Sequence, residues 1–217
     1  MLRWELRLEL RNIGTMIVLL PYAATLAVLF HYSLQPDVFH EGKNLMGLLL
    51  ISLFFMVSMM TARAMGREKE SGAFRILLMS GMDRTAYLFA RVVVKSSMIG
   101  ILLLIYSILY NVLLVGTSQF FEVTGRTLLF LLPCTVNLVL LGEIVAILSG
   151  ANRIREIVLP ILFFPLSLPI FIVYSGSSAV LEGRADAAPY TVVLLSLLAV
   201  YAGAGALFFQ FMATDEA

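Results

Sequence analysis

Few residues of this sequence have the types and spacing that chemistry requires. Glu143 is a carboxylic acid inside an apolar segment, and Arg91 and Lys95 lie in the first turns of another. The single cysteine and the two histidines form no Cys-His or Ser-His set, no metal-ligand cluster appears, and there is no GxxxxGK[ST] phosphate loop. We therefore expect no catalytic residue, no metal site and no ATP hydrolysis by the chain itself, so it is not expected to be an enzyme.

The composition indicates whether these groups belong to a soluble protein or to a membrane protein. Of the 217 residues, 60% are hydrophobic and 13% are charged, and the mean hydropathy is +0.96. A soluble domain carries about 25% charged residues. The net charge of +1 gives no argument for a nucleic acid or an acidic substrate. The sequence predicts an all-α membrane protein that contacts the lipid bilayer and binds no nucleic acid.

A helix crosses the hydrocarbon layer with about 20 mostly apolar residues, because each residue rises about 1.5 Å and every backbone polar group must be satisfied within the helix. Segments that meet this requirement recur along the whole chain. We expect six transmembrane helices in one membrane domain that covers residues 1–217. The predicted spans are residues 13–32, 45–64, 87–115, 127–148, 157–174 and 189–211.

The distribution of Lys and Arg predicts the orientation of these spans, because positive charge is retained on the cytoplasmic side. Most of the 15 Lys and Arg residues lie at the N-terminus, in the second loop with its flanks, or in the fourth loop; only Lys43, Arg126 and Arg184 fall on the other side. Both termini are therefore expected in the cytoplasm. Arg91 and Lys95, at the start of the third span, are expected to snorkel toward lipid headgroups.

Residues 1–12 are predicted to form an interfacial elbow helix ahead of the first span. In a helix, Arg3, Arg7 and Arg11 form one stripe and two glutamates lie on the opposite side. The arginines would then face headgroup phosphates. The alternative is an ordinary positively charged flank that only fixes the topology.

The cytoplasmic loop between the second and third spans is the most informative segment. It is charged over residues 67–70, apolar over residues 74–79 and broken at Ser80-Gly81. The apolar block is about one and a half helical turns long, too short to cross a bilayer. Such a short coupling helix either packs on its own membrane domain or docks into a groove of a soluble protein.

Two motifs resemble those of known permeases. Arg-Glu-Lys-Glu-x-Gly at residues 67–72, followed by an apolar helix, a break and a second basic residue, looks like the coupling segment of ABC-2-type transporter permeases. The stretch 152–170, a basic loop that enters an apolar span with a repeated Leu-Pro pattern, is similar to a segment of the haem exporter protein B (CcmB) family of cytochrome c maturation proteins. Two positions depart from the wider pattern: Arg75, where an acidic residue is frequent, and Gly81, where proline is frequent.

The resemblance implies an ABC-2-type permease fold within a larger assembly. The permease would form a homodimer and bind an ABC ATPase subunit (CcmA-like) that carries ATP and Mg. Further implied partners are CcmC-like, CcmD-like and CcmE-like haem-handling membrane proteins, in a bacterial-type cytoplasmic (inner) membrane. The residues implied in ATPase coupling are Glu68, Glu70, Gly72, Phe74, Arg75, Leu77, Leu78 and Met82.

The function implied by the resemblance is delivery or release of haem in cytochrome c maturation, coupled to ATP hydrolysis by the separate subunit. Haem is then a transported or handled ligand, and no cofactor is assigned to the chain itself. Two alternatives stay open: an ABC-2-type exporter of lipid, glycan or drug, and a non-transporting scaffold that relays ATPase motion to a haem-handling partner. A haem-axial role for His31 or His40 is an alternative to ordinary placement at the membrane interface.

Three prolines distinguish the fifth span. Pro160, Pro165 and Pro169 each remove a backbone donor and should bend the helix. The bend is interpreted either as part of a flexible gating helix or as a static feature of the packing.

The acid of the fourth span needs a partner, because an unpaired carboxylate inside a membrane is costly. Glu143 lies near the cytoplasmic end of the span, so we expect a structural ion pair with Arg153 or Arg155 rather than a transport role. Cys134 is expected to be a small buried hydrophobic residue.

Overall fold

The computed structural model describes residues 13–35, 42–71, 84–115, 120–149, 155–181 and 184–211, and nearly all of these residues are helical. No strand occurs in these ranges, as the sequence predicts. The elements are α2 (Ile13–Ser33), α3 (Gly42–Ser71), α5 (Arg84–Tyr110), the π-helical turn η2 (Asn111–Val115), α6 (Phe120–Ser149), α7 (Arg155–Gly176), α8 (Ser178–Leu181) and α9 (Ala188–Phe211).

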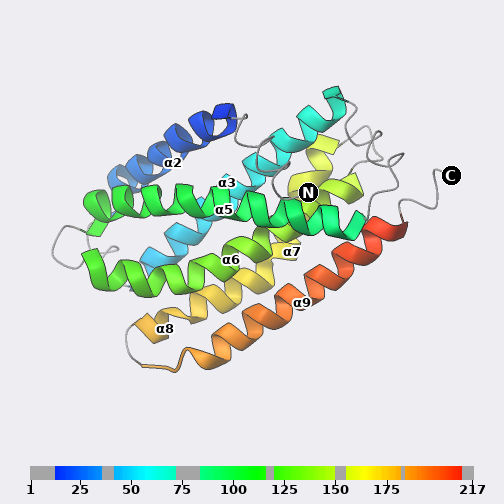
Figure 1. Ribbon diagram of the computed structural model, residues 1–217. Helices are drawn as coiled ribbons and strands as arrows, with labels where there is room; N and C mark the ends of the chain where they lie inside the picture. Colours follow the sequence, from blue (N-terminus) through cyan, green and yellow to red (C-terminus); the bar gives the residue numbers. More distant parts are fainter. Residues whose placement is uncertain are drawn as a thin grey trace.

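Helix α6 is the centre of the bundle. It packs against α3, α5, α7 and α9, whereas α2 contacts mainly α3 and α5. The long helices run side by side, and the end of α3, the start of α5 and the end of α9 lie at the same end of the bundle (Figure 1). A group on α6 is therefore well placed to touch several other helices.

Four helices contain segments that are long and apolar enough to cross a bilayer: Met46–Ala64, Thr85–Leu113, Ile161–Val180 and Ala188–Phe208. Helices α2 and α6 contribute the shorter apolar stretches Ile17–Ser33 and Phe130–Ala146 within the described residues. The structure thus agrees with a multi-pass helical membrane protein, with four of the six expected spans at full length. The expected elbow helix at residues 1–12 and the apolar block at 74–79 lie outside the described residues.

The helices on either side of the second loop extend beyond the predicted spans. Helix α3 continues past Ala64 to Ser71, and α5 begins at Arg84, ahead of the expected start at Tyr87. The added residues of α3 include Arg, Glu and Lys, which are strong helix formers. Hydropathy marks where a helix leaves the hydrocarbon layer, but it does not mark where the helix ends.

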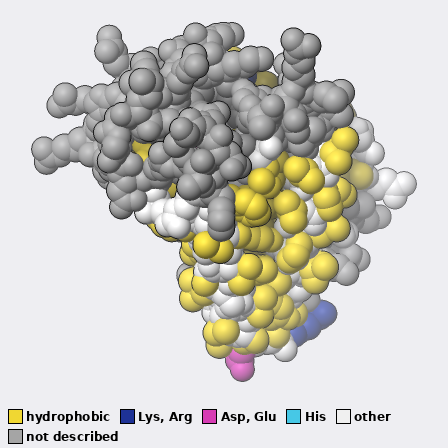
Figure 2. All heavy atoms as spheres, turned by 90° about the vertical axis from the view of Figure 1, so that its right-hand side faces the viewer, with side chains coloured by type: hydrophobic (Ala, Val, Ile, Leu, Met, Phe, Trp, Pro, Cys, Tyr) yellow, Lys and Arg dark blue, Asp and Glu magenta, His cyan; other side chains and the backbone are white. Residues whose placement is uncertain are grey.

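The outer faces of the bundle are apolar. Ile17 of α2, Ile101 of α5, Ile172 of α7 and Leu195 of α9 are all more than half exposed. Figure 2 shows a face whose described surface is mostly hydrophobic, with acidic and basic groups at its lower edge. Exposed apolar area of this extent is a liability in water, but it is the expected surface toward lipid.

Aromatic rings join α3 to α7. The ring of Phe54 on α3 stacks on Phe163 of α7 with 4.9 Å between centroids. It also meets Phe164 and Phe171 edge to face, at 6.0 and 5.4 Å. Such ring pairs contribute about 0.5–1.5 kcal/mol each beyond the area they bury. This contact fixes the position of α7 against α3.

A close contact between α3 and α6 depends on a glycine. A Cβ added to Gly142 of α6 would lie 2.7 Å from the Thr61 Oγ1 atom of α3 and 3.6 Å from its Cγ2 atom. Thr61 is buried, so its side chain has little room to move away. Small residues at such points let membrane helices pack closely.

Gly142→Ala is expected to lower the stability of the protein by about 1–3 kcal/mol, because the new methyl group overpacks the contact with Thr61. The measurement is the thermal unfolding midpoint of the purified protein in lipid nanodiscs. Adding Thr61→Ala should restore the midpoint, because it removes the atoms that clash. Gly203→Ala is the matched control, since a Cβ there meets nothing within 4 Å; an equal loss in this control would contradict the explanation.

Candidate functional site

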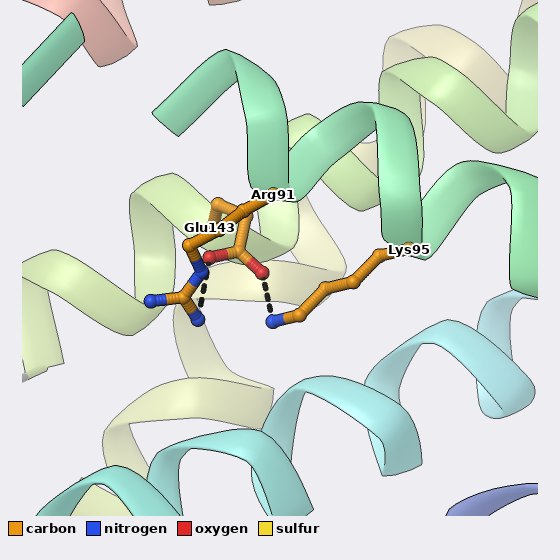
Figure 3. A network of polar contacts seen from close by, with 3 residues as sticks. All are labelled: Arg91, Lys95 and Glu143. Carbon is orange, nitrogen blue, oxygen red and sulfur yellow. Dashed lines mark hydrogen bonds and ion pairs between the residues drawn. The ribbon is translucent and has the colours of Figure 1, made fainter. Parts of the chain in front are cut away.

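Three charged side chains meet inside the bundle and form what we call the ionic triad: Arg91 and Lys95 of α5 and Glu143 of α6. The Arg91 Nη2 atom lies 3.0 Å from the Glu143 Oε2 atom. The Lys95 ammonium group donates a hydrogen bond to the Glu143 Oε1 atom. Each carboxylate oxygen therefore faces its own cation (Figure 3).

The ionic triad is shielded from the surroundings of the protein. The exposed fractions are 6% for Arg91, 5% for Lys95 and 2% for Glu143, and no other charged side chain that the structure describes is buried. Charges removed from water attract one another strongly, but each loses its hydration. Removal of one partner leaves an uncompensated charge in the interior. Such a buried ionic group is therefore stable only while all its partners are present.

The spacing of Arg91 and Lys95 along α5 allows both cations to reach the same carboxylate. Arg91 and Lys95 are four residues apart, so they lie on the same face of a helix about one turn apart. The Arg91 guanidinium also lies over the ring of Tyr87, another four residues earlier, with its central carbon 5.5 Å from the ring centroid. This cation–π contact helps to hold the guanidinium beside the carboxylate.

Neighbouring contacts enclose the triad on further sides. A Cβ on Gly205 of α9 would lie 3.1 Å from a methyl carbon of Leu88 on α5 and 3.2 Å from Ile144 on α6. Gly142, the residue before Glu143, lies close to Thr61 of α3. Helices α3 and α9 therefore each contact α5 or α6 within a few residues of the triad.

The structure supplies the ion pair expected for Glu143 but with partners that the sequence analysis did not assign. Arg153 lies outside the described residues, and of Arg155, the first residue of α7, only the backbone is described. The partners are Arg91 and Lys95, so the expectation that these two snorkel toward headgroups is wrong. The Glu143 carboxylate on the adjacent helix binds both cations inside the protein. Arg91 and Lys95 therefore do not depend on lipid headgroups for their charged partner.

Other polar side chains tie the helices together in pairs. The hydroxyl groups of Ser52 on α3 and Tyr106 on α5 are 2.7 Å apart and share a hydrogen bond. The side-chain amide of Asn137 on α6 donates to the Leu194 carbonyl of α9 at 3.2 Å. Polar groups commonly join membrane helices in this way.

The prolines expected to bend the fifth span all lie in α7, which is an uninterrupted α-helix from Arg155 to Gly176. The Tyr201 hydroxyl of α9 donates to the Leu166 carbonyl, three residues before Pro169, at 2.8 Å. Proline removes the helix hydrogen bond to the carbonyl four residues earlier, which for Pro169 is that of Pro165, so Tyr201 binds a carbonyl next to the one that is freed. A gating role for Pro160, Pro165 and Pro169 stays a prediction.

Most of the remaining predicted site residues lie outside the side chains that the structure describes. Glu68 and Glu70 lie in the last turns of α3, where only the backbone is described, and Gly72 to Met82 lie outside the described residues. His31 is exposed and its ring packs edge to face on Tyr32, while His40 lies outside the described residues. Within the described ranges no three His, Cys, Asp or Glu side chains could hold a metal ion. Cys134 is fully buried and free, as expected.

Glu143→Leu should lower the free energy of unfolding by about 3–5 kcal/mol, because Arg91 and Lys95 would stay buried without their acceptor. Thermal unfolding in nanodiscs measures the loss. Arg91→Met and Lys95→Met, added to Glu143→Leu, should recover most of it, since apolar side chains can replace a buried ionic group. Removal of an exposed carboxylate by Asp186→Leu is the control; a loss as large as that of Glu143→Leu would mean that burial of the charges is not the cause.

Comparison with known proteins identifies the family. No curated protein matches the chain. The family model described as CcmB protein matches residues 1–215, nearly the whole sequence. Taken with the multi-pass helical fold, this match places the chain in the CcmB family.

Proposed function

We propose that this chain is the membrane permease subunit of an ABC transporter that serves haem delivery or release in cytochrome c maturation. The observation that carries the proposal is the family match over residues 1–215. Apolar membrane-crossing helices and the absence of a P-loop motif from the sequence support a permease that depends on a separate ATPase.

The proposed topology has six spans, with both termini in the cytoplasm. Helices α2 and α6 supply the two spans whose described apolar stretches are shorter than the others. The excess of Lys and Arg in the second and fourth loops supports the orientation. In this topology the triad lies toward the cytoplasmic side, because α5 begins there and Arg91 lies only seven residues after Arg84.

The proposed contact with the ATPase is the coupling segment, residues 68–82, which begins in the last turn of α3 and ends just before α5. Its apolar residues Phe74, Leu77 and Leu78 would fill a groove of the partner, and Glu68, Glu70 and Arg75 would supply charged contacts. The assembly holds two permease copies and two ATPase subunits, along with CcmC-like, CcmD-like and CcmE-like proteins. It lies in a bacterial-type inner membrane.

Purification of the native complex tests the proposed function. Tagged protein extracted in mild detergent should retain an ABC ATPase and haem-handling membrane proteins. In a bacterial strain without its own CcmB, the chain should restore covalent haem in c-type cytochromes, as measured by haem staining of separated proteins. Recovery of an ATPase alone, with no restoration of haem staining, would instead favour the generic exporter.

Phe74→Ala together with Leu78→Ala should abolish co-purification of the ATPase, because the substitutions remove the apolar side chains proposed to fill its groove. The amount of permease in the membrane should stay unchanged. Leu195→Ala with Phe208→Ala is the matched control, since both side chains are exposed on α9. An undiminished ATPase yield from the coupling-segment variant would contradict the proposed contact.

A further inference from the structure

The two helices that flank the coupling segment contact adjacent residues of α6. Helix α3 ends at Ser71 and α5 begins at Arg84, so both are directly continuous with the segment. Thr61 of α3 is held against Gly142, and the cations of α5 are bound to Glu143. A displacement of either flanking helix therefore acts on the same turn of α6.

The two contacts differ in kind. The contact between Thr61 and Gly142 is steric, so it resists approach of the helices but not their separation. The contact of Glu143 with Arg91 and Lys95 is ionic and hydrogen-bonded, so it resists separation as well. Because the charges are buried, separating them costs more than it would at a water-exposed surface. The ionic contact therefore opposes both the approach and the separation of α5 and α6.

From α6 the movement reaches the rest of the bundle. Helix α6 packs against α7 and α9 in addition to α3 and α5. Gly205 of α9 lies against Leu88 and Ile144, which are neighbours of the triad on α5 and α6.

We infer that the ionic triad is the joint that transmits movement of the coupling segment to α6 and so to the whole bundle. This inference rests on the proposed function, because it requires an ATPase that moves the segment. Glu143, Arg91 and Lys95 are positioning residues in this account and contact neither ATP nor substrate. Their charges affect the transmission of movement as well as the stability of the protein. The experiment must therefore separate these two effects.

The test uses the full complex with the triple variant Arg91→Met, Lys95→Met and Glu143→Leu, whose apolar side chains keep the contact filled but remove the ionic link. The three measurements are the ATPase yield on co-purification, the rate of ATP hydrolysis, and the amount of haem-containing cytochrome c formed. We expect a normal ATPase yield and continued hydrolysis, with cytochrome formed per ATP reduced about tenfold, a size typical of coupling between distant sites. Asp186→Leu should leave this ratio unchanged.

A ratio equal to that of the unaltered protein in the triple variant would overturn the inference and leave the proposed function intact. Absence of an ATPase from the unaltered complex would overturn both. If the triple variant does not reach the membrane, the exchange of Lys95→Glu with Glu143→Lys decides the question. Each single substitution should lower the ratio and the exchange should restore it; no restoration in an exchange variant that assembles would overturn the inference.

Discussion

Glu143 holds two cations of α5 inside a bundle where none of the three charges is appreciably exposed. This interaction constrains the structure because its three members are stable only together. It fixes the rotation of α5 so that the face carrying Arg91 and Lys95 points at α6. It also fixes their relative height, since a shift by one helical turn would remove a cation from the carboxylate.

The remaining packing is consistent with this constraint. Close contacts at Gly142 and Gly205 bring α3 and α9 against the two joined helices. Apolar side chains form most of the core and also cover the outer faces, where the bilayer is the solvent. The few polar and charged groups in the interior bind helices together, and exposed hydrophobic area is not unfavourable in lipid.

Hydropathy and charge patterns were sufficient to predict the helical class, the positions of the long apolar helices and the need of Glu143 for a partner. They were insufficient to name that partner, because Lys95 and Glu143 are 48 residues apart and hydropathy does not fix the rotation of a helix about its axis. The useful signal was the spacing of Arg91 and Lys95, which places two cations on one face. Two cations one turn apart in an apolar helix can face a buried acid as well as lipid headgroups, and only packing decides between them. The close approach at Gly142 depends on Thr61 of another helix, so the sequence of α6 alone cannot reveal it.

We expect Arg91, Lys95 and Glu143 to form a single buried ionic group between α5 and α6 in the proposed complex as well. A cryo-electron microscopy map of that complex in lipid nanodiscs, at a resolution that shows side chains, tests this expectation. Both cations should lie within hydrogen-bonding distance of the Glu143 carboxylate. A map in which Arg91 and Lys95 extend to headgroups, with Glu143 facing lipid or another helix, would contradict it.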